Sequence, residues 1–231
     1  MADEIAEDQV APEPGAGDDP WTQKFYARGT SGFERAVFFS DAIYAISLTL
    51  VAVQLVLPAL DGLSKTGDVG AVISSGFANL VAYAFTFIWV AFYWKANHRF
   101  TLTLRRIDDR YIWALLVYLA FIALLPFPAA ILGEAWDLRA LAFFFLYLAC
   151  VSALEVLLIL IALRDDLLVR ALNRGESRQW VISSLSPVIA ALISAPICFI
   201  PTYGNWIAIF TMTTISTGIS FMAARRYRAR L

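Results

Sequence analysis

Cysteine and histidine are scarce in this chain of 231 residues, which holds two cysteines and one histidine. Two cysteines cannot form the several disulfides of a small secreted scaffold. Together with a single histidine, they also leave too few ligands for a zinc site built from histidine and cysteine. The sequence therefore falls outside both of these classes.

Several functional motifs are also missing from the sequence. There is no glycine-rich phosphate loop, so ATP is not expected as an energy source. There is no Thr-Val-Gly-Tyr-Gly selectivity filter and no arginine repeat of a voltage sensor. No metal cluster or nucleophile–base pair suggests catalysis, so we expect no enzyme activity, no cofactor and no tightly bound metal.

Charged residues make up only 16% of the chain, and hydrophobic residues make up 60%. Soluble domains average about 25% charged and about 45–50% apolar residues. A soluble protein of this size with so much apolar sequence could not cover its surface with polar groups. The composition therefore indicates a membrane protein with several spans.

Six stretches have the roughly 20 apolar residues that cross a hydrocarbon core of about 30 Å. They lack the period-2 alternation of barrel strands, so helices are expected. We predict an all-α membrane protein with six transmembrane helices and no soluble domain, with spans at about 36–57, 69–94, 111–132, 138–163, 180–200 and 205–224. The first helix is expected to end at Pro58. Kinks are expected at four prolines: Pro126, Pro128, Pro187 and Pro196.

The charges outside the spans are unevenly distributed. Residues 1–20 hold seven acidic side chains and no basic one, which predicts a disordered acidic tail ahead of a transmembrane domain over residues 21–231. With the N-terminus inside, sixteen lysines and arginines fall on the inner side and only Lys65 and Arg139 on the outer side. This positive-inside bias predicts that both termini are cytoplasmic.

Polar residues inside a membrane are costly, so each one is a functional candidate. On the first helix, Ser40, Tyr44, Ser47 and Gln54 form a polar stripe. A mostly apolar stripe of Ile46, Thr49, Leu50, Val53 and Leu57 lies about 100° away. Periodicity favours the polar stripe as the functional face and leaves the apolar stripe for lipid or packing. The alternative interpretation is that the polar groups only join helices in a bundle.

Three further ionisable residues fall within or beside the spans: Asp41, His98 and Glu155. Asp41 and His98 are expected at the same depth near the inner boundary, where a structural hydrogen bond for His98 is favoured over a proton relay. Glu155 could carry protons, bind an ion or pair with a neighbouring polar group.

Three motifs resemble one known family. Arg35-x-x-x-Phe39-Ser40-Asp41 in the first span resembles the signature of the transmembrane protein 175 family, potassium channels of lysosomes with shorter prokaryotic relatives. Trp94-x-x-x-His98-Arg99 is similar to the end of that family's second helix. The stretch from Leu124 to Gly133 is similar to its third helix. The resemblance covers about residues 33–225 and points to a prokaryotic member.

The resemblance implies a bacterial channel through which potassium moves passively. Four chains would surround a central pore lined by the first helix of each, in the plasma membrane. Ile46 would form a hydrophobic constriction continued by Leu50 and Val53, and Thr49 a polar ring that transiently coordinates K⁺. This assignment reverses the one that periodicity favours, because the mostly apolar stripe becomes the pore face.

The resemblance also implies a structural network of side chains that hold the helices together: Arg35, Phe39, Ser40, Asp41, Asn97 and His98. Two departures from the family are Ala42, where glycine often follows the signature, and Asn97, where many relatives have a second histidine. The alternative function is a proton-coupled transporter or proton leak that uses Glu155, Asp41 or His98.

Overall fold

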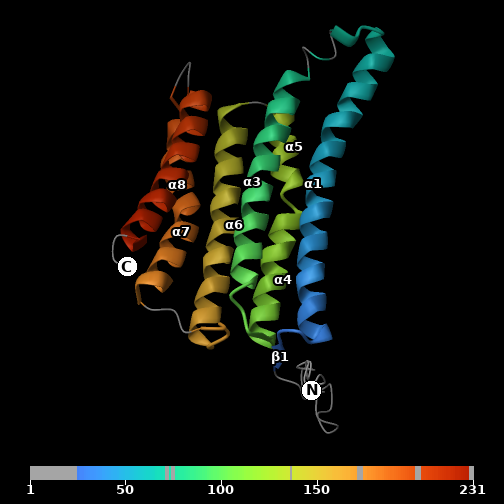
Figure 1. Cartoon of the computed structure of the whole chain (residues 1–231). Coiled ribbons are helices and arrows are strands. Elements are labelled where there is room, and N and C mark those ends of the chain that lie inside the picture. The colour runs from blue at the N-terminus through green and yellow to red at the C-terminus, as the bar shows by residue number, and fades with distance from the viewer. Residues whose placement is uncertain are drawn as a thin grey trace, which may run out of the picture.

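The computed structural model describes residues 25–70, 73, 76–135, 137–170, 174–200 and 204–228. The predicted acidic tail, residues 1–20, lies outside the described residues. The described chain is a bundle of long helices that run side by side (Figure 1). The described residues include seven helices and two short strands, in the order β1 (Phe25–Ala27), α1 (Ser31–Thr66), α3 (Phe77–Thr101), β2 (Arg106–Asp108), α4 (Asp109–Ala123), α5 (Pro126–Ala135), α6 (Leu138–Arg164), α7 (Arg174–Ile197) and α8 (Gly204–Arg228).

Four helical stretches are long and apolar enough to cross a membrane: Ser31–Val53, Asp109–Ala135, Leu138–Arg164 and Gly175–Ile197. They correspond to the first, third, fourth and fifth predicted spans. The second predicted span corresponds to α3, and the sixth to α8, whose apolar part is Trp206–Ile219. Each predicted span therefore has a helical counterpart.

Some of the predicted boundaries are wrong. The first helix does not end at Pro58 but continues to Thr66. A proline within a helix removes one backbone hydrogen bond, and here the chain continues as a helix beyond it. The second long helix begins at Phe77 rather than near residue 69, and it extends to Thr101, so His98 lies within α3. The fifth helix begins at Arg174, ahead of the predicted residue 180.

The third span is broken where the proline pair was expected to kink it. Helix α4 ends at Ala123, the chain turns at Leu124 and Leu125, and α5 begins at Pro126. Proline lacks a backbone N–H, so Pro126 cannot donate to the Ile122 carbonyl four residues earlier. In contrast, α7 runs continuously through Pro187 and reaches Pro196 in its last turn.

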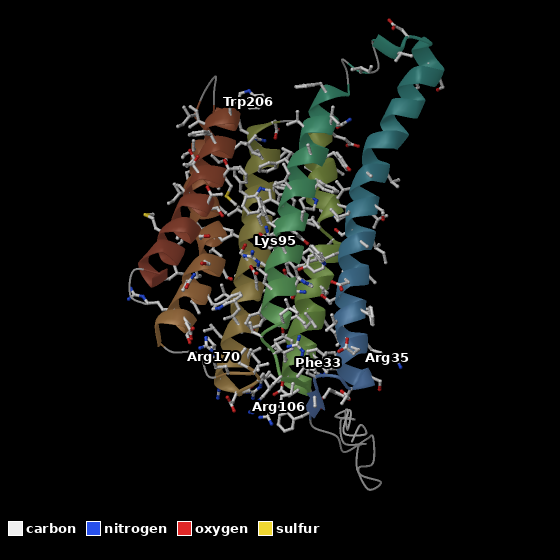
Figure 2. The ribbon with its side chains drawn as sticks, in the orientation of Figure 1. Phe33, Arg35, Lys95, Arg106, Arg170 and Trp206 are labelled. Carbon is white, nitrogen blue, oxygen red and sulfur yellow. The ribbon has the colours of Figure 1, made fainter. Side chains whose placement is uncertain are left out.

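A strand pair, which the span analysis did not predict, joins two loops at the end of the bundle where α1 begins. Strands β1 and β2 are antiparallel, with Tyr26 opposite Ile107. The guanidinium group of Arg106 lies 4.2 Å from the centre of the Phe25 ring, an attractive cation–π geometry. Figure 2 shows Arg35, Arg106 and Arg170 at this end of the bundle and Trp206 at the other.

The core lies between α3, α4 and α6. Its largest fully buried side chains include Tyr118, Phe144, Phe145 and Leu148. Helix α1 packs against α3, α4 and α5 on one side of this core, whereas α7 packs against α6 on the other side and α8 packs against α7 (Figure 1). Helix α1 therefore stands at one edge of the bundle, with one side in contact and one side open.

Candidate functional site

The first half of α1 is joined to α3 by polar side chains. Asn97 Nδ2 donates a hydrogen bond to Ser40 Oγ over 3.0 Å, and both residues are buried. Trp94 Nε1 donates to Asp41 Oδ1 over 3.0 Å. The Trp94 ring also stacks on His98, with the ring centroids 5.3 Å apart. Two hydrogen bonds one residue apart on α1 thus fix its rotation against α3.

The other two residues of the predicted network lie away from this contact. Phe39 is 49% exposed. Arg35 is exposed near the start of α1 (Figure 2) and forms no ion pair within the described part of the chain. The structure therefore gathers four residues of the predicted network: Ser40, Asp41, Asn97 and His98.

One turn further along, the buried face of α1 contacts α4. The hydroxyl oxygens of Tyr44 and Tyr118 lie 2.7 Å apart and form a buried hydrogen bond. Ser47 Oγ donates to the Ile122 carbonyl over 2.9 Å. This carbonyl cannot be reached by an N–H of Pro126, and it also accepts from Leu125 N over 3.2 Å. Ser47 on α1 therefore helps to satisfy the backbone at the break between α4 and α5.

The opposite face of α1 is open. Ile46, Leu50 and Val53 are 52%, 45% and 46% exposed, and their spacing of three to four residues places them on one helical face. Thr49 is exposed on the same face, and its Oγ1 donates to the Ile46 carbonyl over 2.8 Å. The polar stripe is thus buried at Ser40, whereas the mostly apolar stripe is free for other contacts. Gln54 and Leu57, also assigned to the two stripes, lie outside the residues with described side chains.

The ionisable residues considered for proton transport do not form one cluster. Asp41 and His98 both contact Trp94, where α1 meets α3. Glu155 on α6 is buried and faces a crevice bounded by α3, α7 and α8. Within the described residues, no group of three or more histidine, cysteine, aspartate or glutamate side chains could hold a metal ion.

Two of these contacts were missed at the level of the sequence. The sequence-based prediction gives Trp94 no partner, although its spacing of four from His98 places both rings on one helical face. This spacing was the available signal for the stacked pair. Tyr118 carried no comparable signal, because a tyrosine in an apolar run can face lipid, water or a neighbouring helix equally well. Its contact with Tyr44 depends on how α1 and α4 pack.

Comparison with known proteins bears on the first half of the chain. Residues 35–126 match the model of a family described as endosomal/lysosomal potassium channel TMEM175. This stretch contains most of α1 together with α3, β2 and α4. The resemblance predicted from the motifs is therefore confirmed over these residues.

Two curated relatives are bacterial proteins named potassium channels. The chain is 28% identical to one from Chryseobacterium sp. (strain P1-3) over 97 residues, which are 42% of this chain and 47% of the relative. It is 27% identical to one from Streptomyces collinus over 100 residues, which are 43% of this chain and 47% of the relative. The chain thus spans about half the length of the curated relatives it matches.

A solved structure has the same fold. It is described as a lysosomal potassium-selective channel TMEM175 homolog from Chamaesiphon minutus. It matches with a TM-score of 0.68 and 18% identity, covering 84% of this chain and 99% of that chain. Together with the apolar helices, this match confirms the predicted fold class, an all-α membrane protein that crosses the bilayer several times.

Proposed function

We propose that this chain is one subunit of a potassium-permeable channel in a bacterial plasma membrane, with four copies around a central pore lined by α1. Potassium moves passively down its electrochemical gradient, and both termini lie in the cytoplasm. The proposal draws on the family match over residues 35–126 and on relatives that are named potassium channels. Because those matches cover part of each relative, the activity of this chain rests on its own geometry.

The observation that carries the proposal is the exposed, mostly apolar face of α1. The bundle buries Ser40 and Tyr44 and leaves Ile46, Leu50 and Val53 exposed. In the proposed tetramer this exposed face of α1 can therefore face the central symmetry axis. Around four-fold symmetry this face would form successive rings. A ring of isoleucine side chains closes a narrow pore by excluding water, without any charged gate. Ile46 is therefore the proposed constriction.

Thr49 supplies the polar ring of the proposed pore. Its hydroxyl proton is directed to the Ile46 carbonyl, so the lone pairs of Oγ1 stay available on the exposed side. Four such oxygens can replace part of the hydration shell of an ion. Potassium is held less tightly by water than sodium and sheds that shell more easily. We expect modest selectivity, because one ring offers fewer ligands than a filter of stacked carbonyls.

The hydrogen bonds of the buried face of α1 are assigned a structural role. Ser40 and Asp41 hold α1 against α3 through Asn97 and Trp94, and Tyr44 holds it against α4. These contacts fix the rotation of α1 and thereby its exposed face. The signature residues are thus assigned to positioning the pore helix rather than to contacting ions.

The test is Ile46→Asn in protein reconstituted into liposomes. An amide in the constriction should wet it and raise basal potassium flux several-fold. The matched control is Ile189→Asn, which makes the same change at an exposed isoleucine of α7, on the far side of the bundle from α1. If Ile46→Asn leaves the flux unchanged, or if both variants raise it equally, Ile46 is not the gate.

Two further measurements separate the channel from the proton-coupled alternative. A channel gives single-channel currents in bilayers, whereas a transporter saturates with substrate and follows a proton gradient. Particle images in detergent should show four-fold symmetry with α1 on the axis. A monomer that is silent in bilayers would contradict both the pore and the tetramer.

A further inference from the structure

A crevice of about 770 Å³ lies between α3, α6, α7 and α8. It is separate from the exposed face of α1, which is at the other edge of the subunit (Figure 1). Its volume is within the range of small-molecule and cofactor sites, about 300–1,000 Å³. Its walls combine a buried carboxyl group, two basic side chains, a set of hydroxyl groups and an aromatic surface. The proposed pore uses none of these groups.

The carboxyl group belongs to Glu155 on α6. The residue is only 8% exposed and lines the crevice. Within the described part of the chain, no hydrogen bond or ion pair to its carboxyl group is observed. The adjacent hydroxyl groups, Tyr93 and Ser152, bond to each other over 2.7 Å instead. A carboxylate removed from bulk water is stabilised by a paired donor, and since Glu155 lines the crevice, a donor bound there can reach its oxygens.

Two threonine hydroxyl groups of the crevice are arranged as hydrogen-bond acceptors. Thr213 Oγ1 donates to the Ile209 carbonyl over 3.0 Å, and Thr217 Oγ1 donates to the Thr213 carbonyl over 2.6 Å. Since each hydroxyl has a single proton, these oxygens offer only lone pairs to a ligand. With Glu155, the crevice therefore favours a ligand that carries several N–H donors and a positive charge.

Two basic residues on the α3 wall supply the opposite charge. Lys95 and Arg99 are four residues apart, so they lie on one helical face, and both are exposed and line the crevice. Figure 2 shows Lys95 on α3 within the height of the bundle. Neither forms an ion pair within the described residues. Basic pockets between transmembrane helices on the cytoplasmic side are suited to phosphate head groups.

The polarity of the α3 wall changes along its length. Beyond Lys95, toward the start of α3, the wall is mostly apolar and aromatic, formed by Tyr93, Phe92, Trp89, Ile88 and Phe85. Arg99 and Phe85 are fourteen residues apart, about 21 Å at 1.5 Å per residue. The charged end is the predicted cytoplasmic end of α3, and the apolar part extends through the middle of the helix at Trp89. This order, head group inside and tail toward the centre, is that of a lipid in the inner leaflet.

We propose that this crevice binds an aminophospholipid of the phosphatidylethanolamine type. Its primary ammonium group donates to Glu155 and to the hydroxyl oxygens, its phosphate lies against Lys95 and Arg99, and one acyl chain lies along the aromatic wall at Trp89. A phosphatidylcholine head group has the same charges but no N–H donor. A phosphatidylglycerol head group lacks the positive charge for Glu155. The site should therefore distinguish these three lipids.

The first test uses the wild-type, full-length protein in detergent. Native mass spectrometry follows its titration with phosphatidylethanolamine, the mono- and dimethylated analogues, phosphatidylcholine and phosphatidylglycerol, all with the same acyl chains. We expect phosphatidylethanolamine to bind about tenfold more tightly than phosphatidylcholine, a difference of about 1.4 kcal/mol. Affinity should fall at each methylation. Equal affinity across this series would overturn the proposal, and this result needs no variant to fold.

The second test assigns the two ends of the head group. Glu155→Gln should abolish the preference for phosphatidylethanolamine over phosphatidylcholine, whereas Lys95→Gln combined with Arg99→Gln should weaken phosphatidylethanolamine and phosphatidylglycerol alike. The controls are Glu134→Gln and Arg139→Gln, two exposed residues outside the crevice. A preference that survives Glu155→Gln would overturn the proposal. So would phosphatidylglycerol binding as tightly as phosphatidylethanolamine. Neither result bears on the proposed pore, because lipid binding is measured without ion flux.

Discussion

Tyr44 on α1 and Tyr118 on α4 have hydroxyl oxygens 2.7 Å apart, and their side chains are 1% and 0% exposed. We predict that changing either tyrosine to phenylalanine destabilises the protein, and that changing both destabilises it less than either single change. Phenylalanine keeps the ring and removes only the hydroxyl group. The packing of α1 on α4 is therefore preserved while the hydrogen bond is lost.

The magnitude follows from which polar groups remain buried. Each single variant leaves one hydroxyl group without its partner, which costs about 1–3 kcal/mol in a protein interior. Hydrogen bonds between transmembrane helices average about 0.6 kcal/mol, with a maximum near 1.7. We therefore expect about 1 kcal/mol for each single variant. The double variant leaves no unpaired hydroxyl at this contact and should lose only about 0.5 kcal/mol, so the coupling energy is about 1.5 kcal/mol.

The assay is reversible unfolding of the purified protein in mixed micelles as the fraction of a denaturing detergent rises. The wild type, the two single variants and the double variant are compared at equal protein concentration, which keeps any effect of oligomer assembly constant. Tyr83→Phe is the matched control, because it removes a hydroxyl from a partly exposed tyrosine of α3. The control should shift the midpoint by less than either single variant.

One result would refute this reasoning. If the double variant lost the sum of the two single losses, the hydroxyl groups would act independently, and the 2.7 Å contact would not be an energetically coupled hydrogen bond. Helix α1 would then be positioned by its contacts with α3 and by apolar packing.

Two other predictions concern α1. Thr49→Val should lower the preference for potassium over sodium while the channel still conducts. Four valine side chains around the pore have nearly the same shape as four threonines but offer no oxygen ligand. Reversal potentials in mixed salt measure this, and an unchanged value would exclude the Thr49 ring. Ser40→Ala should lower the free energy of unfolding by about 1 kcal/mol, since the buried Asn97 amide loses a partner. An unshifted midpoint in the same micelle assay would show that this bond contributes nothing.

The helices could be predicted from the sequence more reliably than their ends. Apolar content and the length of a membrane span leave few choices, so all six predicted spans have helical counterparts. The ends depend on weaker local effects. Pro58 was expected to stop α1, but the helix continues to Thr66. At Pro126 the chain does break, and there a neighbouring helix supplies the Ser47 hydroxyl for the Ile122 carbonyl.

The candidate site was likewise predictable from the sequence only in part. The motif residues of α1 and α3 could be identified in the sequence, and the resemblance indicated which residues belong to the network. The individual hydrogen-bond pairs within the network could not be predicted. Asp41 bonds to Trp94 rather than to a residue of the predicted network, because the rotation of α3 determines which side chain faces it. The crevice around Glu155 is formed by four helices that the sequence does not place side by side.

The sequence by itself determined that this chain is a helical membrane protein, since free energies of transfer into a bilayer depend on composition and length over some twenty residues. It also supplied the motifs that led to the family. Only the tertiary structure decided which face of α1 is buried. Periodicity on one helix separates two stripes, but the identity of the buried one depends on what α3 and α4 present. Because Asn97, Trp94 and Tyr118 offer hydrogen-bonding groups, the polar stripe turns inward and Ile46 is left exposed.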